Sequence, residues 1–416
     1  MVYILDITGK PMMPTKRHGK VRRLLKGGLA KVVSLMPFTI QLNYETSTYT
    51  QPISLGVDTG SVNIGISATT EKEELFAGHF ILRTDIVKLL ASRRENRKFR
   101  RMRKVRFRRA IPNRKLSKGW IAPSVRVTVD SHIKVINLIH KIMPITKTII
   151  EVGSFDYQKI TNPQIKSVEY QNGEQAGFWN IREYILYRDN HCCQHCKGKS
   201  GDKVLNVHHI ESRKTGGDAP NNLITLCETC HKLYHQGKIQ LSAKRGKSLR
   251  DATLMNHLKW EIYKHIPSEY NAQITWGYLT KSRRIKAGIQ KSHNADAFCI
   301  ANNLNAIKTP FLYVGRFFAR HTRSLQVTVP KKGGFRKKLV ASHWIGKTKL
   351  QKHDVVEYNG NKYFIFGRSH QCISLKNAYG VLQTGKPYIS YNKVRFVRRK
   401  HSSMILEKYN INKLKF

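Results

Sequence analysis

Residues 193–235 carry the most informative pattern in the chain, CQHCKGKSGDKVLNVHHIESRKTGGDAPNNLITLCETCHKLYH. Two Cys-x-x-Cys pairs bracket this segment, Cys193 with Cys196 and Cys227 with Cys230. Four thiolates in two such pairs suit a closed, tetrahedral structural zinc site. Buried or disulfide-bonded cysteines are the alternative, but paired Cys-x-x-Cys spacing favours a metal. Because thirty residues separate the pairs, the metal would hold a unit larger than a simple zinc ribbon.

Histidines and an asparagine occupy the space between and after the cysteine pairs. A strand-like apolar run ends in His208 and His209, and Asn222 precedes the next apolar run. His231 and His235 are four residues apart, so they share one face of a predicted helix. Neutral imidazole binds divalent cations, and an unligated imidazole can take a proton from water near neutral pH. The pattern predicts a strand pair and a helix that gather histidines around a cation.

This order of residues between cysteine pairs resembles the HNH endonucleases, whose ββα-metal site hydrolyses one nucleic-acid strand with a single cation. The resemblance implies that His209 is the general base and that Asn222 orients it. It also implies that His208 and His231 bind the catalytic cation, with His235 as a further candidate ligand. A second zinc cluster without catalysis is the alternative interpretation of these histidines.

Basic residues dominate the composition. The chain has 416 residues, with 75 Lys and Arg against 26 Asp and Glu, and a net charge of +49 at pH 7. A compact chain with this charge repels itself unless a polyanion neutralises it. The excess is larger than a short DNA site would explain, so a structured RNA is the predicted partner. With 40% hydrophobic residues, the chain is also long enough for two or three domains with their own cores.

The remaining composition indicates a reducing compartment and no membrane. No apolar run reaches the roughly 18 residues of a spanning helix. Cys192, Cys299 and Cys372 lie outside the paired motif, and the N-terminus has no basic leader or cleavage site. We therefore expect a cytoplasmic protein.

Three acidic residues lie at the ends of predicted strands or at the start of a predicted helix. Asp58 and Glu151 each end an apolar, strand-like run, and Asp296 follows His293 by three residues at a predicted helix start. A pair of Mg²⁺ or Mn²⁺ ions needs several oxygen ligands from different elements, which these carboxylates could supply. His293 shares a helix face with Asp296 and could activate or position the attacking water. Taken singly, each acid is more simply a cap or a surface charge.

The arrangement of these acids resembles the RuvC branch of the RNase H superfamily, divided into three parts. An insertion follows the first part, and the HNH-like segment lies between the second and third. The resemblance implies an α/β core in which Asp58, Glu151 and Asp296 bind two Mg²⁺ ions.

The first insertion is rich in arginine. Between residues 93 and 109, eleven of seventeen residues are Lys or Arg, and only Glu95 is acidic. Phe99, Met102 and Val105 have the three-residue spacing of a helix, which would need a polyanion because like charges repel at every turn. Arginine forks bind phosphates bidentately, although a disordered basic linker is the alternative. The predicted nucleic-acid contacts are Arg93, Arg94, Arg97, Lys98, Arg100, Arg101, Arg103, Lys104, Arg106, Arg108 and Arg109.

Together, residues 1 to about 310 resemble the transposon-encoded IscB proteins, relatives of the CRISPR single-effector nucleases. The resemblance is carried by a β-rich, PLMP-like module with Pro11-Met12-Met13-Pro14, a three-part RuvC-like core, an arginine-rich bridge helix and an HNH insert. It implies a PLMP-like module at 1–50, RuvC-like parts at 51–81, 116–172 and 241–310, a bridge helix at 82–115, an HNH domain at 173–240 and a C-terminal domain at 311–416. Short alternating strands predict that the C-terminal domain is β-barrel-like.

The IscB resemblance also implies an activity and partners. The chain would be a monomer in a ribonucleoprotein in the prokaryotic cytoplasm, associated with the nucleoid. A bound guide RNA, the omega RNA, would select double-stranded DNA next to a short flanking motif that the C-terminal domain reads. The HNH site would cut the guide-paired strand and the RuvC-like site the displaced strand. A guide-independent nuclease and a catalytically inactive, zinc-stapled RNA-binding protein are the alternatives.

Overall fold

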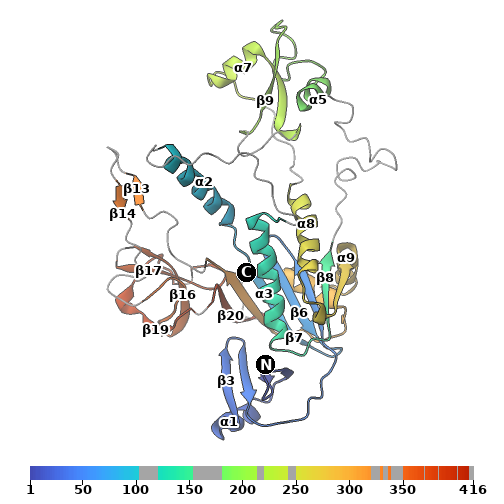
Figure 1. Ribbon diagram of the computed structural model, residues 1–416, viewed down its shortest axis with the longest axis vertical. Coiled ribbons are helices and arrows are strands. Elements are labelled where there is room, and N and C mark those ends of the chain that lie inside the picture. The colour runs from blue at the N-terminus through green and yellow to red at the C-terminus, as the bar shows by residue number, and fades with distance from the viewer. Residues whose placement is uncertain are drawn as a thin grey trace. The chain divides into compact units, whose positions relative to one another are not determined.

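The computed structural model describes residues 1–102, 120–152, 180–212, 220–241, 250–319, 328–330, 336–338, 350–369, 371–382, 384–400 and 402–411. The chain is a mixed α/β structure with several sheets (Figure 1). It forms two compact units, one of which combines Met1–Gly153 with His257–Phe416, and the other of which is Ser154–Asn256. The second unit therefore interrupts the first in sequence. None of the described helices is long and apolar enough to cross a membrane.

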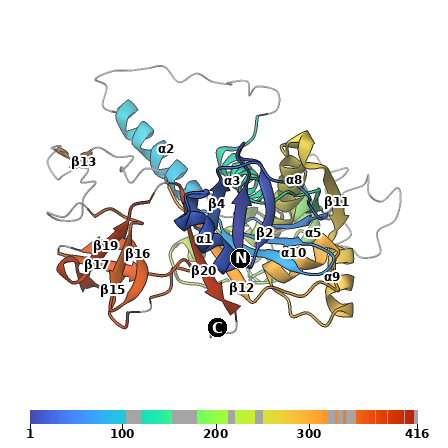
Figure 2. The same cartoon turned by 90° about the horizontal axis from the view of Figure 1, so that it is seen from below.

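A small mixed sheet begins the first unit (Figure 2). Its elements are β1 (Val2–Leu5), β2 (Pro11–Thr15), α1 (His18–Lys26), β3 (Ala30–Leu35) and β4 (Phe38–Leu42). The strand order is β2-β1-β4-β3, and β1 runs parallel to β4. Tyr3 on β1 is fully buried in the main core of this unit, and its hydroxyl donates to the Leu75 carbonyl at 3.2 Å. The β-rich N-terminal segment is thus anchored to the sheet that follows it.

A seven-stranded sheet forms the centre of the first unit, in the order β11-β8-β5-β6-β7-β12-β20. Its strands are β5 (Ser54–Thr59), β6 (Asn63–Thr69), β7 (Glu74–Ile81), β8 (Lys147–Val152), β11 (Ala272–Trp276), β12 (Phe311–Phe317) and β20 (Met404–Asn410). The first three form an antiparallel meander. Strand β8 runs parallel to β5 and to β11, β12 runs parallel to β7, and β20 is antiparallel to β12. Parallel neighbours place the carboxyl ends of β5, β8 and β11 at one edge of the sheet.

Five helices accompany this sheet. They are α2 (Ile86–Met102), α3 (Pro123–His140), α8 (Arg250–Lys264), α9 (Gly277–Lys286) and α10 (His293–Ala301). Side chains alternate between the faces of a strand, and on β5 the apolar Leu55 and Val57 pack in one core with Val135 and Ile136 of α3. The intervening Gly56 faces α10 instead, so the two helices lie on opposite faces.

Glycines allow α10 to lie directly on the sheet. A Cβ atom added at Gly56 would come closer than 3.0 Å to the backbone of Ala297, and one at Gly65 closer than 3.0 Å to that of His293. Ser292 caps the helix by accepting from the Ala295 backbone N–H at 3.3 Å. The start of α10 is therefore held against the strand that carries Asp58.

The C-terminal region contributes to two sheets. Strands β12 and β20 complete the seven-stranded sheet, and strands between residues 355 and 398 form a five-stranded sheet ordered β18-β17-β16-β15-β19. The strands of this sheet are β15 (Val355–Tyr358), β16 (Asn361–Ser369), β17 (Cys372–Lys376), β18 (Ile389–Ser390) and β19 (Arg395–Arg398). A separate antiparallel pair is formed by β13 (Thr328–Pro330) and β14 (Arg336–Lys338). Within the described ranges, the edge strands β18 and β19 do not pair with each other, so the order is that of an open sheet. The segment predicted as one C-terminal domain thus also supplies part of the central sheet.

The second unit is small. It contains α5 (Ile181–Arg188), the antiparallel pair β9 (Leu205–His209) and β10 (Leu223–Cys227), a 3-10 turn at Pro220–Asn222, and α7 (Glu228–His235). Its described residues form two small buried clusters, one of Cys193, Cys227 and Cys230 with Ile224 and Leu226, and one of Tyr184, Ile185 and Leu223. Cysteines make up much of the first cluster, so a metal bound by them would add to the stability of the unit.

Candidate functional site

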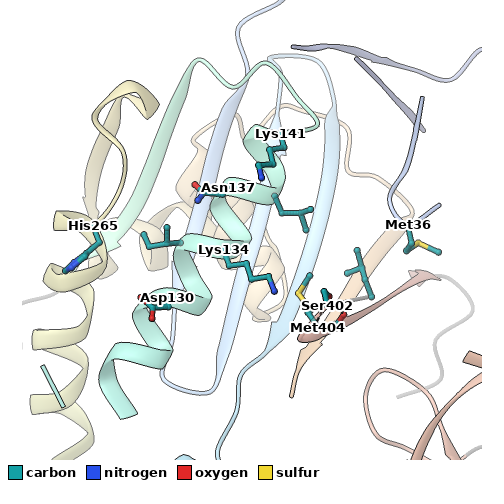
Figure 3. Close-up of a pocket in the computed structure, with 11 residues that line it drawn as sticks. Met36, Asp130, Lys134, Asn137, Lys141, His265, Ser402 and Met404 are labelled. Carbon is teal, nitrogen blue, oxygen red and sulfur yellow. Dashed lines mark hydrogen bonds between the residues drawn. The ribbon is translucent and has the colours of Figure 1, made fainter. Parts of the chain in front are cut away.

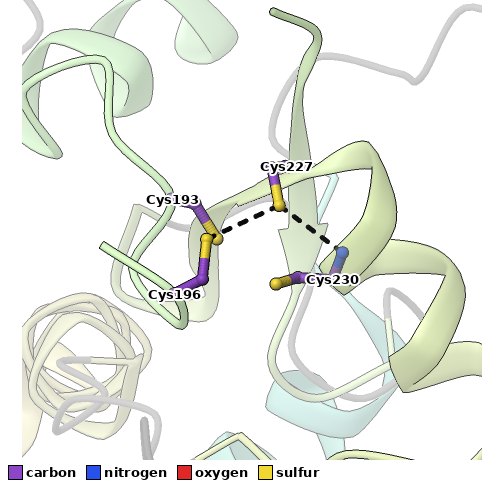
Figure 4. Close-up of side chains that lie close together, drawn as sticks. All are labelled: Cys193, Cys196, Cys227 and Cys230. Atoms are coloured by element: carbon purple, nitrogen blue, oxygen red, sulfur yellow. Dashed lines mark hydrogen bonds between the residues drawn. The ribbon is translucent and has the colours of Figure 1, made fainter. Parts of the chain in front are cut away.

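Four cysteines meet at the end of the β9–β10 pair (Figure 4). The Sγ atoms of Cys193, Cys196, Cys227 and Cys230 all lie within 4.8 Å of one another. None of them forms a disulfide, and Cys196 Sγ lies 3.8 Å from Cys227 Sγ, well beyond the roughly 2.05 Å of an S–S bond. Cys227 also caps α7, because its sulfur accepts from the Cys230 backbone N–H at 3.5 Å. Four largely buried soft donors at this spacing fit a structural zinc ion.

Polar neighbours favour the thiolate form of part of this cluster. The Ser200 hydroxyl donates to Cys227 Sγ at 3.1 Å. The hydrogen bond with Ser200 also lowers the pKa of Cys196 to about 6. Burial acts in the opposite direction on Cys230, whose thiol pKa it raises. A positive ion at the centre of the cluster would offset the cost of ionising the more buried thiols.

Three histidines of the second unit form another cluster. One ligating nitrogen each from His208, His231 and His235 lies within 4.8 Å of the other two. Nε2 of His231 and Nε2 of His235 are 3.3 Å apart, one helical turn from each other on α7. The His208 ring lies edge-on to both, with centroids 5.1 Å away. The strand and the helix thus bring together the three predicted cation ligands.

The electrostatics of this cluster suit neutral imidazoles. Burial, followed by His231 and His235, lowers the pKa of His208 to about 4. Burial also lowers the pKa of His231. The Nε2 atom of His208 is buried and has no hydrogen-bond partner. An unpaired buried nitrogen beside two further imidazoles fits the ligand set of a divalent cation.

Neither His209 nor Asn222 belongs to the cluster of His208, His231 and His235. His209 follows His208 on β9, so its side chain projects from the other face of the strand, and it is not a member of the three-histidine group. Asn222 is fully buried, and its amide accepts from the Glu211 backbone N–H at 2.9 Å and donates to the Glu211 carbonyl at 3.0 Å. Asn222 therefore fixes the backbone just after His209, and the roles of both as base and orienter stay predictions.

The first unit brings its predicted acids to one edge of the seven-stranded sheet. In the register of β5 and β8, Val57 pairs with Ile150, so Asp58 and Glu151 are the next residues on parallel neighbours. The Thr59 hydroxyl joins these strand ends by donating to the Glu151 carbonyl at 3.0 Å. Burial raises the pKa of Asp296, and Asp58 and Glu151 raise it further. The carboxylates of Asp58 and Glu151 are thus close enough to act electrostatically on that of Asp296.

His293 completes this edge. Its Nδ1 atom lies 2.8 Å from Oδ2 of Asp58. Asp58 is largely buried, whereas the His293 side chain is 42% exposed. The bond to Asp58 is the main cause that raises the pKa of His293 above its ordinary value of 6.5. A histidine that is held by a carboxylate and faces solvent is suited to transfer or orient a proton of water.

Two cations form ion pairs with these carboxylates, and sequence reasoning missed both. Lys259 Nζ lies 2.7 Å from Glu151 Oε1, and Arg284 Nε lies 3.0 Å from Asp296 Oδ1. Within the part of the chain that the structure describes, the three acids do not form a group with all ligating atoms within 4.8 Å. Oxygen ligands of this kind fit Mg²⁺, but Glu151 and Asp296 would have to leave these cations to bind it.

A pocket of about 530 Å³ lies beside α3, on the face of the sheet opposite to α10 (Figure 3). Its walls include Asp130, Lys134 and Lys141 of this helix, with Met404 of β20 and His265. None of the acids, histidines or cysteines predicted for the two sites lines it. The pocket is therefore separate from both candidate sites.

The arginine-rich segment begins as helix α2. Its described part covers Ile86–Met102, within the range 82–115 expected for the bridge helix. Arg93, Arg94, Arg97 and Lys98 are exposed. The side chains of Arg100 and Arg101, and all of Arg103, Lys104, Arg106, Arg108 and Arg109, lie outside the described residues. The described part presents a basic surface suited to phosphate.

Comparison with known families identifies the class of the second unit. Residues 193–237 match the model of the HNH endonuclease family, so the chain contains an HNH endonuclease domain. Residues 2–173 match the family described as RRXRR protein. No curated protein is significantly similar to the chain in sequence.

Solved structures of Streptococcus thermophilus Cas9 are distantly similar. The complex with AGGA PAM has a TM-score of 0.34 and 12% identity over 59% of this chain and 33% of that one. The complex with the GGAA PAM gives 0.33 and 13% over 53% and 32%, and that with the AGAA PAM gives 0.30 and 12% over 44% and 26%. The chain thus spans about a third or less of the Cas9 chains, and TM-scores at this level do not establish a shared fold.

Proposed function

We propose that the chain is an IscB-like, RNA-guided DNA endonuclease with two nuclease sites. The HNH domain cuts the strand paired to the guide, and a RuvC-like site at Asp58, Glu151 and Asp296 cuts the displaced strand. The observation that carries this proposal is the bond between His293 and Asp58 at the sheet edge where Glu151 ends its strand. This bond supports a second nuclease site, which lies in the first unit, whereas the HNH histidines lie in the second. Two sites are needed because each would cut one strand of the duplex.

The HNH site divides its work among residues of β9 and α7. His208, His231 and His235 would hold a Mg²⁺ or Mn²⁺ ion, which would supply positive charge beside the scissile phosphate. His209, on the opposite face of the strand from His208, takes the proton of the attacking water. Asn222 holds the backbone that follows His209, and the four cysteines hold the hairpin to α7 through a structural zinc ion.

At the second site, Asp58, Glu151 and Asp296 would hold two Mg²⁺ ions, which would supply Lewis-acid chemistry to the phosphate and to water. Asp58 also orients His293, whose ring can then accept or deliver a proton beside the scissile bond. Lys259 and Arg284 balance the charge of the acids before the ions bind. The arrangement of β5 to β7, β8 and β11 supports a split RNase H-like core of this kind.

A bound guide RNA accounts for the charge. The exposed arginines of α2 and a net charge of +49 support a structured RNA as a permanent partner. Base pairing then supplies sequence specificity, and the C-terminal region reads the short flanking motif on duplex DNA.

The test starts from the protein purified from its host with any bound RNA. The RNA is sequenced, and DNA that matches its variable end is offered with Mg²⁺. We expect cutting of both strands, a displaced-strand nick alone from His209→Ala, and a paired-strand nick alone from Asp58→Ala. Cutting without RNA would instead indicate a guide-independent nuclease, and RNA binding with intact DNA would indicate an inactive binder. Unchanged double-strand cutting by both variants would overturn the assignment of the sites.

A further inference from the structure

A row of residues crosses three strands beside the acidic edge of the sheet. Asp58 on β5 pairs with Gly65 on β6, and Gly65 pairs with His79 on β7. Residues paired across neighbouring strands project to the same face. Since Gly65 has no side chain, the face is open between Asp58 and His79, and the backbone of His293 lies directly over it.

His293 is held from both sides in this gap. Its Nδ1 atom bonds Asp58, and its ring stacks on that of His79 with centroids 5.4 Å apart and planes at 29°. Asp58 fixes one edge of the ring, whereas His79 covers its face. Two contacts from different strands leave the ring few orientations.

His79 itself is fixed by a neighbour on β6. Its Nε2 atom lies 3.1 Å from Oδ1 of Asn63. Because an amide oxygen only accepts, this bond places the proton on Nε2 and sets the tautomer. Burial is the main cause that lowers the pKa of His79 to about 4, which agrees with a neutral ring packed against His293.

The C-terminal region supports His79 from the other side. Residues 377–381 follow β17 and lie against the central sheet, where the Ala378 backbone N–H donates to Oε2 of Glu407 at 2.8 Å. Arg316 on β12 donates to the carbonyls of Ala378 and Tyr379. The Tyr379 ring is thereby placed 6.0 Å from that of His79.

We propose that His79 is a positioning residue of the acidic site, which holds the His293 ring against Asp58, and that residues 377–381 hold His79 in turn. This inference rests on the proposed function, because it assigns a role in cutting the displaced strand. It also connects the C-terminal region to that site through the contacts of Tyr379, His79 and His293. His79 does not reach the reacting atoms and acts only through His293.

The first experiment compares His79→Ala with His79→Phe in the ribonucleoprotein. We expect His79→Ala to lower kcat for the displaced strand about 10-fold to 100-fold, with KM for DNA unchanged, since a misplaced catalytic group costs about this much. His79→Phe keeps a ring against His293 and should restore most of the rate. Cutting of the paired strand in the same reactions reports on folding and DNA binding, and an equal loss on both strands would contradict the proposal.

A double-mutant cycle separates positioning from general destabilisation. In a His293→Ala background, His79→Ala should have almost no further effect on displaced-strand cutting, because its only target is gone. If His79→Ala lowered the rate of displaced-strand cutting by the same factor with and without His293, the proposal would be overturned. In the C-terminal region, Tyr379→Ala should lower the displaced-strand rate, and Tyr388→Ala, which removes a half-exposed ring from the following segment, should not.

A structure of the His79→Ala protein tests the inference without a measurement of DNA cleavage. We expect His293 to leave its orientation, with Nδ1 beyond hydrogen-bond distance of Asp58. An unmoved His293 would overturn the positioning role, whatever the enzyme cuts. If instead the wild-type protein cuts no displaced strand, the proposed function fails while this geometric result still decides the inference.

Discussion

Lys259 and Glu151 form an ion pair of 2.7 Å, with side chains only 6% and 14% exposed. The pair joins α8 to β8 at the sheet edge where Asp58 lies. Each buried charge would be costly alone, because burial removes most of its hydration. Lys259 therefore stabilises the carboxylate that the proposed function assigns to metal binding.

Removing this lysine should make stability depend on metal. Lys259→Met keeps the apolar stem but leaves Glu151 unpaired, which should lower the free energy of unfolding by about 3 kcal/mol. Mg²⁺ should restore part of the loss, because the ion neutralises the same carboxylate. Thermal unfolding with and without Mg²⁺ measures this. The double variant with Glu151→Gln should show little response to the ion, and an equal response in all three proteins would contradict the argument.

Loss of the cysteine cluster should unfold the second unit alone. Cys227→Ser replaces a thiolate ligand by a hydroxyl, which can still accept from Ser200 and cap α7, so the change acts on metal binding. Since zinc binding of this kind drives folding, we expect Ser154–Asn256 to become protease-sensitive while the first unit stays protected. Bound zinc, measured by native mass spectrometry, should be lost. Cys372→Ser, outside the cluster, serves as the control, and full zinc occupancy in Cys227→Ser would refute the assignment.

The three histidines of the HNH domain should differ in their effect on metal affinity. His208 is buried, His231 is half-buried and His235 is exposed. His231→Ala should therefore raise the Mg²⁺ concentration for half-maximal paired-strand cutting about 10-fold to 100-fold, and His235→Ala by less. Lys232→Ala, on the exposed side of the same helix, should change nothing. Equal Mg²⁺ requirements for wild type and His231→Ala would exclude His231 as a ligand of the cation.

The exposed arginines of α2 should bind RNA through its phosphates. Replacing Arg94 and Arg97 by alanine removes two cations, so the slope of log affinity against log salt should fall by roughly 0.7 to 0.9 for each phosphate that is no longer neutralised. Affinity for the bound RNA, measured at several salt concentrations, tests this. Glu95→Ala on the same helix should leave the slope unchanged or steeper, and an unchanged slope in the arginine variant would place the RNA elsewhere.

The features of the sites that depend on residues close together in the sequence could be predicted. The HNH domain, predicted from cysteine pairs and ordered histidines, is confirmed by the family match at residues 193–237. Spacing along a helix places His231 beside His235, and the two Cys-x-x-Cys pairs predict a metal site, for which the structure brings the four thiols together. Such features depend on neighbours in sequence, for which periodicity is informative.

Contacts between distant segments could not be predicted in the same way. Lys259 and Glu151 are 108 positions apart, and no spacing rule pairs a lysine of an amphipathic helix with one strand end. The placement of His79 depends on strand register across β5, β6 and β7, which the hydrophobic pattern of one strand does not specify. Strand β20 likewise joins the central sheet through pairing that only the folded chain reveals.

Glu74 should make the stability of the first unit fall as pH rises. It is 5% exposed, accepts hydrogen bonds from the Ser67 hydroxyl and from the Thr309 backbone N–H, and burial raises its pKa from 4.5 to about 7. Between these values the folded chain keeps a proton that the unfolded chain releases, so stability is greatest below pH 4.5 and is lost as pH rises through about 7.

Glu74→Gln stays neutral at every pH and can keep both hydrogen bonds, since its amide donates to Ser67 and accepts from Thr309. Relative to wild type, the variant should therefore gain about 3 kcal/mol in free energy of unfolding between pH 4.5 and a pH above 7. Other titrating groups, such as the buried His132, cancel in this difference because both proteins share them. Denaturant midpoints of the two proteins at each pH measure the gain. A difference that does not vary with pH would mean that the pKa of Glu74 is the same in the folded and the unfolded chain.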